Sequence, residues 1–413
     1  MRTYSLPYGD SQVEFTLPEG SEAHCIEPNK VQTLKNIRSE VSKSLYKLNG
    51  IIKPSRRVAI IVDDITRPTP TAEILPSLLD YLNSKGVRDD LISLMVALGT
   101  HRPMTPEELM VKYGEALDRV NLIQPDFRDP EKQVRVGVMP GGAPIEVNKE
   151  ISKVDMAIGV GMVTPHHVSG FSGGSKIVLP GISGERTVGE MHLLSARLRR
   201  SFLGIEKNEV RDLMDLVANR ARLRGLVELV VDGRGEPTWV GAGYVGEVFK
   251  EGVREARRVY EVESPRALDF VIASSYPADL EFWQAHKSLY PADMILRDGG
   301  TLILLTPCPE GVAKTHSEVV ELAGLPPEEI DKRVREEFVR DPVGAANSIV
   351  WSKIRSRIKI VVVSDGISEN EAKSMGFGWY GDLQEAINSE MKGLHRPRVG
   401  IMRNAPELLP KVR

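Results

Sequence analysis

Short apolar runs alternate with amphipathic segments along most of this chain. The apolar runs at 58–62 and 302–305 are continuous, which is typical of strands that a parallel sheet buries on both faces. In the segments between such runs, for example 72–85 and 383–392, apolar residues recur at helical spacing. This alternation predicts an α/β protein with mainly parallel sheets covered by helices.

The same pattern gives the expected positions of the elements. We predict helices at 31–48, 72–85, 183–201, 209–222, 244–263, 313–323, 327–339 and 383–392. We predict strands at 91–98, 155–160, 226–232, 238–241, 268–273, 301–305, 358–363 and 399–402. Segments 3–6 and 12–17 should form a hairpin around Gly9-Asp10. Thr105-Pro106-Glu107-Glu108 has the cap, proline and acidic residue of a helix start.

A domain boundary is expected near Ser264-Pro265. The charged helix predicted at 244–263 ends there, and a new α/β cycle begins at 268. We therefore predict two α/β domains, 1–264 and 265–413, with the last residues packing back on the first domain. A cleft between two domains is a common place for a ligand site. In this prediction the first domain carries the catalytic residues and the second closes the active-site cleft.

Composition narrows the class of protein. The 413 residues carry a formal net charge of -3, which offers no electrostatic attraction for nucleic acid. Cys25 and Cys308 form no CxxC pair, which suits a reducing cytosol. The N-terminus lacks a signal-peptide pattern, and the apolar runs are too short to span a bilayer. We expect a cytoplasmic protein that binds neither membrane nor nucleic acid.

The segment 166–176, with the sequence HHVSGFSGGSK, concentrates the most chemistry. His166 and its neighbour can bind a metal or carry a proton. The loop that follows can expose backbone N–H groups to a phosphate, and it consists of Ser172, Gly173, Gly174 and Ser175. Lys176 can pair with an anion or bond covalently to a cofactor. Since few structural needs call for all of these together, the segment predicts an active site.

A nucleotide-binding P-loop is the obvious alternative for this segment. That motif needs Gly-Lys followed by Ser or Thr, because the hydroxyl holds magnesium. Here Ser175 separates Gly174 from Lys176, and Ile177 follows the lysine. A phosphotransferase is therefore the weakest of the functions that we consider.

Polar clusters also follow two of the predicted strands. Asp64, Thr66 and Arg67 come after the strand at 58–62, and His101 comes after the strand at 91–98. Ligands of open α/β sheets bind at the carboxyl ends of strands, and a guanidinium suits a carboxylate or phosphate. Read singly, the first cluster also fits a simple turn, and the histidine fits a capping residue.

Three more residues have both a structural and a functional interpretation. His192, in the helix predicted at 183–201, is either a buried histidine bonded to backbone or a metal ligand. No HExxH motif or cysteine pair accompanies it, so one histidine suffices only if a cofactor supplies the other metal ligands. Gln284 and Lys287 share a helix face, which is either solvated or part of a site.

In order and spacing, these motifs resemble those of the nickel-pincer lactate racemase family. The resemblance runs from about residue 1 to residue 400. It rests on the motifs at residues 64–68 and 99–105, on His166 with the loop at 172–176, on His192, and on Gln284 with Lys287. It implies a nickel ion held by a pyridinium-3,5-bisthiocarboxylic acid mononucleotide. The cofactor is tethered to Lys176, and His192 is the protein's nickel ligand.

The resemblance also implies roles for the remaining motif residues. His101 and His166 would act as acid and base on opposite faces of the substrate. Arg67, Gln284 and Lys287 would bind the substrate. The remaining motif residues would lie on the cofactor side; they are Asp64, Thr66, Ser172, Gly173, Gly174 and Ser175.

The implied function is inversion of C2 in a lactate-like 2-hydroxy acid by a racemase or epimerase. Hydride would pass reversibly to the cofactor while one histidine takes the hydroxyl proton, and separate enzymes would make the cofactor. The alternative is a non-enzymatic protein that binds a mononucleotide or small anion. The family's tyrosine is replaced here by Trp283, and Val168 is also apolar, so we expect short aliphatic substrates.

Overall fold

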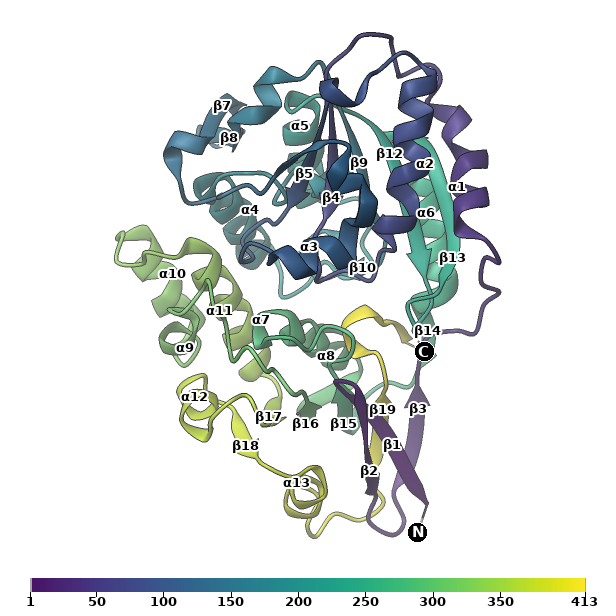
Figure 1. Ribbon diagram of the computed structural model, residues 1–413. Helices are drawn as coiled ribbons and strands as arrows, with labels where there is room; N and C mark the ends of the chain where they lie inside the picture. The colour runs from purple at the N-terminus through teal and green to yellow at the C-terminus, as the bar shows by residue number, and fades with distance from the viewer. Residues whose placement is uncertain (1, 413) are drawn as a thin grey trace.

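The protein is built on two six-stranded sheets, one in each of two units stacked in Figure 1. The computed structural model describes residues 2–412. The first sheet has the order β13–β12–β9–β4–β5–β6, in which only β13 is antiparallel to its neighbour. Its strands are β4 (Val58–Asp63), β5 (Ile92–Ala97), β6 (Asn121–Ile123), β9 (Met156–Met162), β12 (Leu223–Val231) and β13 (Pro237–Tyr244).

The second sheet is entirely parallel and has the order β18–β17–β16–β15–β19–β3. Its strands are β3 (Glu22–Ile26), β15 (Leu268–Ser274), β16 (Leu296–Leu305), β17 (Lys359–Val363), β18 (Gly378–Tyr380) and β19 (Arg398–Met402). Four separate strand pairs complete the fold: β1 (Thr3–Tyr8) with β2 (Ser11–Thr16), β7 (Gln133–Val138) with β8 (Pro144–Asn148), β10 (Pro165–His166) with β11 (Gly170–Phe171), and β14 (Glu261–Ser264) with β20 (Leu409–Val412).

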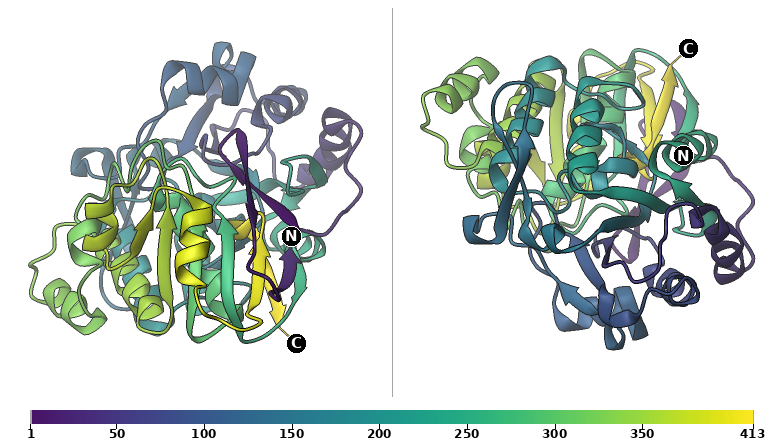
Figure 2. Two further views of the ribbon diagram at one scale, coloured as in Figure 1. Left: turned by 90° about the horizontal axis from the view of Figure 1, so that it is seen from below. Right: turned by 90° about the horizontal axis from the view of Figure 1, so that it is seen from above.

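Helices flank both sheets, as the views in Figure 2 show. Those of the first unit are α1 (Ile37–Leu45), α2 (Thr71–Ser84), α3 (Pro106–Tyr113), α4 (Glu185–Leu198), α5 (Glu209–Arg220) and α6 (Val245–Tyr260). Those of the second unit are α7 (Phe282–Ala285), α8 (Leu289–Ile295), α9 (Val319–Leu322), α10 (Pro327–Arg335), α11 (Pro342–Arg355), α12 (Glu369–Ser374) and α13 (Leu383–Glu390). The predicted α/β class with mainly parallel sheets is confirmed.

The continuous apolar run of β4 reflects burial on both faces of the first sheet. All six of its residues are buried. Alternate side chains enter two different cores: Ile60 packs in one cluster and Ile61 in the other. This arrangement is what the sequence pattern predicted for a central parallel strand. The hairpin β1–β2 and the capping box of Thr105 and Glu108 on α3 are also confirmed.

The predicted helices and the structure differ at several places. The helix predicted at 31–48 begins only at Ile37, because the Asn36 side chain caps it by accepting the Ser39 N–H. The helix predicted at 313–323 shrinks to α9, because side-chain contacts fix the preceding loop, including a hydrogen bond of His316 to Asp341. Helix α11 was not predicted, because it is buried nearly all round and shows no amphipathic period.

The N-terminal segment also departs from the predicted division at residue 264. Strand β3 pairs in parallel with β19 of the second sheet, and the hairpin places Leu6 and Phe15 in the core of the second unit. Strand β3 therefore joins the second sheet and the hairpin packs on the second unit, a partner that local pattern alone does not reveal. At the other end, β20 pairs with β14 directly after α6.

The order of strands places a topological switch point in each sheet. In the first sheet, the connections that follow the neighbouring strands β4 and β9 lead toward opposite edges of the sheet. In the second sheet, the same holds for the neighbouring strands β15 and β19. Loops diverge at such points and leave a crevice at the carboxyl ends of the strands. Where α4 meets α11, an added Cβ on Gly189 would lie 2.7 Å from Pro342, so this glycine permits the close approach of the two units.

Candidate active site

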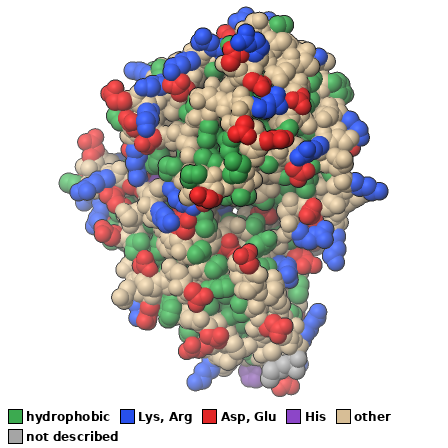
Figure 3. Space-filling view, in the orientation of Figure 1, with side chains coloured by type: hydrophobic (Ala, Val, Ile, Leu, Met, Phe, Trp, Pro, Cys, Tyr) green, Lys and Arg blue, Asp and Glu red, His purple; other side chains and the backbone are tan. Residues whose placement is uncertain are grey.

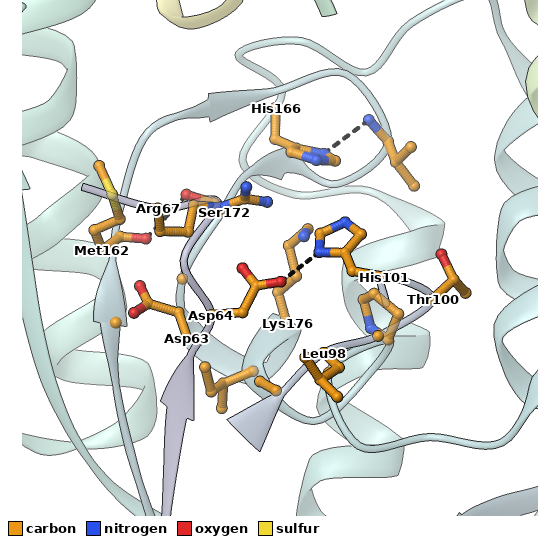
Figure 4. Close-up of a pocket in the computed structure, with 18 of the residues that line it drawn as sticks. Asp63, Asp64, Arg67, Leu98, Thr100, His101, Met162, His166, Ser172 and Lys176 are labelled. Atoms are coloured by element: carbon orange, nitrogen blue, oxygen red, sulfur yellow. Dashed lines mark hydrogen bonds and ion pairs between the residues drawn. The ribbon is translucent and has the colours of Figure 1, made fainter. Parts of the chain in front are cut away.

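A cavity lies between the two units. Side chains from both units line it. On the face of the molecule shown in Figure 3, charges of both signs are interspersed. Most of the predicted site residues line this cavity; they are Asp64, Arg67, His101, His166, Ser172, Gly173, Lys176, His192, Gln284 and Lys287. Figure 4 shows that several of them turn toward a common space.

His101 is held by hydrogen bonds from both units. Its Nδ1 lies 2.6 Å from Asp64 Oδ2, and since a carboxylate only accepts, Nδ1 carries the proton. Its Nε2 lies 2.8 Å from the Gln284 amide nitrogen, which donates to it. Lys287 donates to the Gln284 oxygen and so fixes the direction of the amide. The Nε2 lone pair of His101 therefore faces the cavity as a proton acceptor.

Asp64 is the anchor of this histidine. Burial alone would raise the pKa of Asp64, but His101, Arg67 and the Thr66 hydroxyl together outweigh it, and the pKa falls below its usual range. Thr66 donates its hydroxyl to Asp64 Oδ1 over 2.5 Å, and Arg67 donates to the Thr66 hydroxyl over 2.9 Å. Thr66 is thus a support behind Asp64 and does not itself line the cavity.

His166 has the opposite tautomer. The backbone N–H of Val168 donates to its Nδ1 over 3.2 Å, so the proton of the neutral ring is on Nε2. Burial lowers the pKa of His166 well below its usual value, and the nearby positive groups Lys176 and Lys287 lower it further. His166 is therefore a neutral donor at pH 7, in contrast to the acceptor at His101.

Lys176 follows the Ser/Gly loop, in the 3₁₀ turn Gly174–Ile177. Among residues 2–412 its ammonium group has no recorded hydrogen-bond partner, and the side chain lines the cavity. Burial lowers the pKa of Lys176 to about 7, with Arg67 and Arg211 adding to the effect. A substantial fraction of this lysine is thus a neutral, nucleophilic amine near neutral pH.

His192 is oriented as a metal ligand would be. Its Nδ1 donates to the Val188 carbonyl over 2.9 Å, one turn back in α4, which leaves the Nε2 lone pair free. Burial lowers the pKa of His192 to about 4, so the ring is neutral at pH 7. Both properties suit coordination, since only the unprotonated imidazole nitrogen binds a metal.

The surroundings of His192 supply no complete metal site. Within residues 2–412, no three His, Cys, Asp or Glu side chains are grouped so as to hold a metal ion. A metal at His192 would therefore need further ligands from a bound molecule. Lys176 in the same cavity offers an amine to tether such a molecule, so the residues present fit a covalently held metal cofactor.

The Ser/Gly loop differs from the expected phosphate cradle. The Gly174 N–H already donates to a carboxylate oxygen of Glu228. The Ser172 hydroxyl proton is likewise already used, because it is donated to the Met162 carbonyl over 2.9 Å. Gly174 and Ser175 do not line the cavity. The expected role of these loop residues in holding a phosphate thus finds no support in their geometry.

Several cavity residues carried no role in the sequence interpretation. His167 stacks on Tyr290 with ring centroids 3.9 Å apart, and its Nε2 lies 3.4 Å from that of His286. Burial lowers the pKa of both histidines, that of His286 to about 3. Its adjacency to His166 had indicated His167 as a possible metal ligand or proton carrier, but without a specific role. Glu228 was hidden inside a strand pattern, although a carboxylate in an apolar run is itself a signal.

Fold and cavity together define a two-unit α/β protein whose cleft holds buried, oriented acid–base groups. Comparison with known families agrees. The family model of the lactate racemase N-terminal domain matches residues 8–204, and that of the lactate racemase C-terminal domain matches residues 264–401. The chain therefore belongs to the lactate racemase family and is an enzyme of the racemase class.

Individual relatives are consistent with this assignment. A lactate racemase from Thermoanaerobacterium thermosaccharolyticum is 26% identical over 406 residues, which cover 94% of each chain. A lactate racemase from Lactiplantibacillus plantarum is 32% identical over 274 residues, which cover 64% of this chain and 63% of that protein.

Solved structures share the fold. The lactate racemase apoprotein from Thermoanaerobacterium thermosaccharolyticum matches with a TM-score of 0.85 at 24% identity, covering 100% of both chains. A protein from Thermotoga maritima matches with a TM-score of 0.74 at 18% identity, covering 92% of this chain and 100% of that one. In the part of the chain that the structure describes, no helix is long and apolar enough to cross a membrane.

Proposed function

We propose that this protein inverts C2 of a small, lactate-like 2-hydroxy acid, using a nickel-pincer mononucleotide tethered to Lys176. One observation carries the proposal: the half-buried amine of Lys176, without a hydrogen-bond partner among residues 2–412, shares a cavity with a neutral imidazole, His192, whose Nε2 is free. The amine would hold the cofactor, and the imidazole would be the protein's ligand to nickel. When bound, this group supplies a reversible two-electron acceptor for the C2 hydrogen of the substrate.

The substrate carboxylate would bind between Arg67 and Lys287. A guanidinium binds a carboxylate through two charge-assisted hydrogen bonds. Burial lowers the pKa of Lys287 well below its usual value, and the charges of Arg67 and Lys176 lower it further. A bound carboxylate would counter that repulsion and favour the charged ammonium. The cationic groups of the cavity therefore favour an anionic substrate.

His101 would be the base for the substrate hydroxyl. Its Nε2 lone pair accepts the Gln284 amide in the structure, and a substrate hydroxyl would take the place of that amide. The ionised Asp64 at Nδ1 would then stabilise the imidazolium that results from proton transfer. His166 would serve the opposite face of the substrate, where its neutral ring donates a hydrogen bond from Nε2 to the substrate oxygen and would give up a proton only after the ring had itself been protonated.

The geometry also separates this function from the alternatives. A protein that only bound a mononucleotide would have no need for a histidine held in one tautomer by a buried carboxylate. A phosphotransferase would need a hydroxyl after the lysine to hold magnesium, and Ile177 stands there. The observed dyad of Asp64 and His101 therefore favours proton-transfer chemistry.

The tether can be tested by mass. The protein should be purified from cells that also make the cofactor, and its intact mass, peptide map and nickel content should be measured. We expect an added mass on the peptide containing Lys176, together with nickel. Lys287→Ala, which removes the other cavity lysine with a depressed pKa, should keep that mass, whereas Lys176→Ala should lose it. An unmodified Lys176 in nickel-containing, active protein would overturn the proposal.

A further inference from the structure

Glu228 is a buried carboxylate of the cavity that the mechanism above does not use. It lies within β12, is 1% exposed, and lines the cavity wall. One oxygen, Oε1, accepts the Gly174 N–H. The other, Oε2, is buried and has no hydrogen-bond partner among residues 2–412. A buried acceptor without a donor is costly, so this oxygen calls for a partner that the chain does not provide.

The neighbouring groups do not satisfy Glu228. Arg211 donates to the carbonyls of Gly173 and Phe171, its buried Nε has no hydrogen-bond partner, and no ion pair joins it to Glu228 in the described part of the chain. Burial raises the pKa of Glu228 to about 7, a shift that the Gly174 N–H and Arg211 oppose and Asp63 reinforces. The carboxyl is therefore held next to the cavity without a counter-ion.

A glycine of the neighbouring strand lies beside Glu228. Gly161 of β9 pairs with Glu228 on one side, and Val160 pairs with Val62 on the other, which puts Asp63 next to Gly161 as well. An added Cβ on Gly161 would lie 3.7 Å from Asp63 Oδ2 and 3.7 Å from Ile177 Cδ1. Gly161 thus leaves a narrow floor between two carboxylates, bordered by the Ile177 side chain, across two strand spacings of about 4.8 Å each.

This floor suits a neutral hydrogen-bond donor and disfavours an anion. Asp63 already has the Thr69 hydroxyl at 2.5 Å and the Lys112 ammonium at 3.4 Å, so Glu228 is the open acceptor. Phosphate next to two carboxylates would be repelled. Vicinal hydroxyl groups, by contrast, can donate to a carboxylate, as the ribose of dinucleotides does to an acidic residue in other α/β folds.

We propose that Glu228 binds the ribose hydroxyl groups of the tethered mononucleotide and so selects a ribosyl ligand. This inference rests on the proposed function, because it takes the mononucleotide as the ligand of the cavity. It assigns to Glu228 a specificity role toward the sugar, separate from the tether at Lys176 and from the metal ligand at His192. It also gives the Gly174 hydrogen bond a purpose, since that bond holds Oε1 and leaves Oε2 as the acceptor without a partner among residues 2–412.

The test is a comparison of two ligands on the full, cofactor-free chain. Calorimetry at pH 8 would measure binding of nicotinic acid mononucleotide and of its 2′,3′-dideoxy analogue. We expect the wild type to bind the ribose form about 10-fold or more tightly, since hydrogen bonds to a charged acceptor are strong. Glu228→Met should bring this ratio close to 1. Glu228→Gln, which keeps an acceptor for Gly174, should give an intermediate ratio.

Controls make each outcome decisive. Asp232→Asn changes another buried carboxylate, which lies just beyond β12, pairs with Arg234 and does not line the cavity. This variant should keep the wild-type ratio of the two affinities. Equal binding of both ligands by the wild type would overturn the ribose role while leaving a mononucleotide site intact. No binding of either ligand would overturn the mononucleotide proposal as well. If Glu228→Met does not fold, an unchanged ratio in folded Glu228→Gln overturns the inference.

Discussion

The placement of single protons distinguishes the two histidines proposed as acid and base. Asp64 fixes the proton of His101 on Nδ1, whereas the Val168 N–H fixes that of His166 on Nε2. One ring thus offers a lone pair to the cavity and the other offers an N–H. A substrate between them would lose its hydroxyl proton to His101. For the other enantiomer His166 would be the base, which requires its proton to leave Nε2 first.

Asp64→Asn tests the fixed tautomer. The amide lacks the charge that stabilises an imidazolium at His101, and its NH₂ group can hold the ring in the wrong tautomer. We expect kcat for racemisation to fall by about 10²-fold or more, with the nickel content unchanged. Chiral analysis of product and metal analysis of the same sample would check this. Unchanged kcat would show that Asp64 is only a structural partner.

The amine of Lys176 should react at unusually low pH. Burial beside Arg67 and Arg211 lowers its pKa to about 7, whereas an exposed lysine has a pKa of about 10.4. Since only the neutral amine is a nucleophile, its acylation rate should rise with pH and level off above about 8. Peptide mapping after brief acetylation of cofactor-free protein would give the midpoint, with Nα-acetyl-lysine as reference. A midpoint near that of the reference would contradict the burial argument.

At the scale of elements, the loop before Lys176 depends on glycine. Gly174 has φ +60°, and an added Cβ would lie 2.8 Å from the Phe249 ring. Gly174→Ala should therefore lower the free energy of unfolding by about 1–3 kcal/mol. Gly246→Ala is the matched control, because an added Cβ there meets nothing within 4 Å. Urea unfolding of the two cofactor-free variants would compare them, and equal stabilities would contradict the strain that we assign to Gly174.

Element prediction succeeded where local pattern and environment agree. The strand at β4 reads as apolar throughout because both faces are buried, and α3 carries its own cap in Thr105. Element prediction failed where tertiary contacts determine the local structure. Helix α11 packs on several neighbours and so lacks a polar face, and the loop around His316 is held by Asp341 from a distant segment.

At the scale of the molecule, the position of the site was predictable, but the hydrogen bonds between its residues were not. Strand ends identified Arg67, His101 and the loop at 172–176, because parallel strands deliver their carboxyl ends to one edge. The sequence could not show that Gln284 of the second unit reaches His101 of the first, since that contact depends on how the units pack. For the same reason it missed the pairing of β3 with the second sheet.

The cavity wall also predicts substrate preference. Val168 and Trp283 line it, and neither can pair a second carboxylate, so a malate-like tail would be left unpaired at high cost. We expect lactate and 2-hydroxybutyrate to be turned over faster than malate or gluconate. Rates for these four acids on nickel-loaded protein would check this. Fastest turnover of malate or gluconate would mean that His167 or His286 faces the tail instead.

The most direct test of the account is interconversion of enantiomers by the loaded enzyme. Protein purified from cells that make the cofactor would be given L-lactate or D-lactate, and the products would be separated by chiral chromatography. The account predicts that either enantiomer ends as a nearly equal mixture, and that His101→Ala and His166→Ala each slow this by about 10²-fold or more while keeping nickel. Nickel-containing protein with a modified Lys176 that leaves both enantiomers of lactate and 2-hydroxybutyrate unchanged would contradict it.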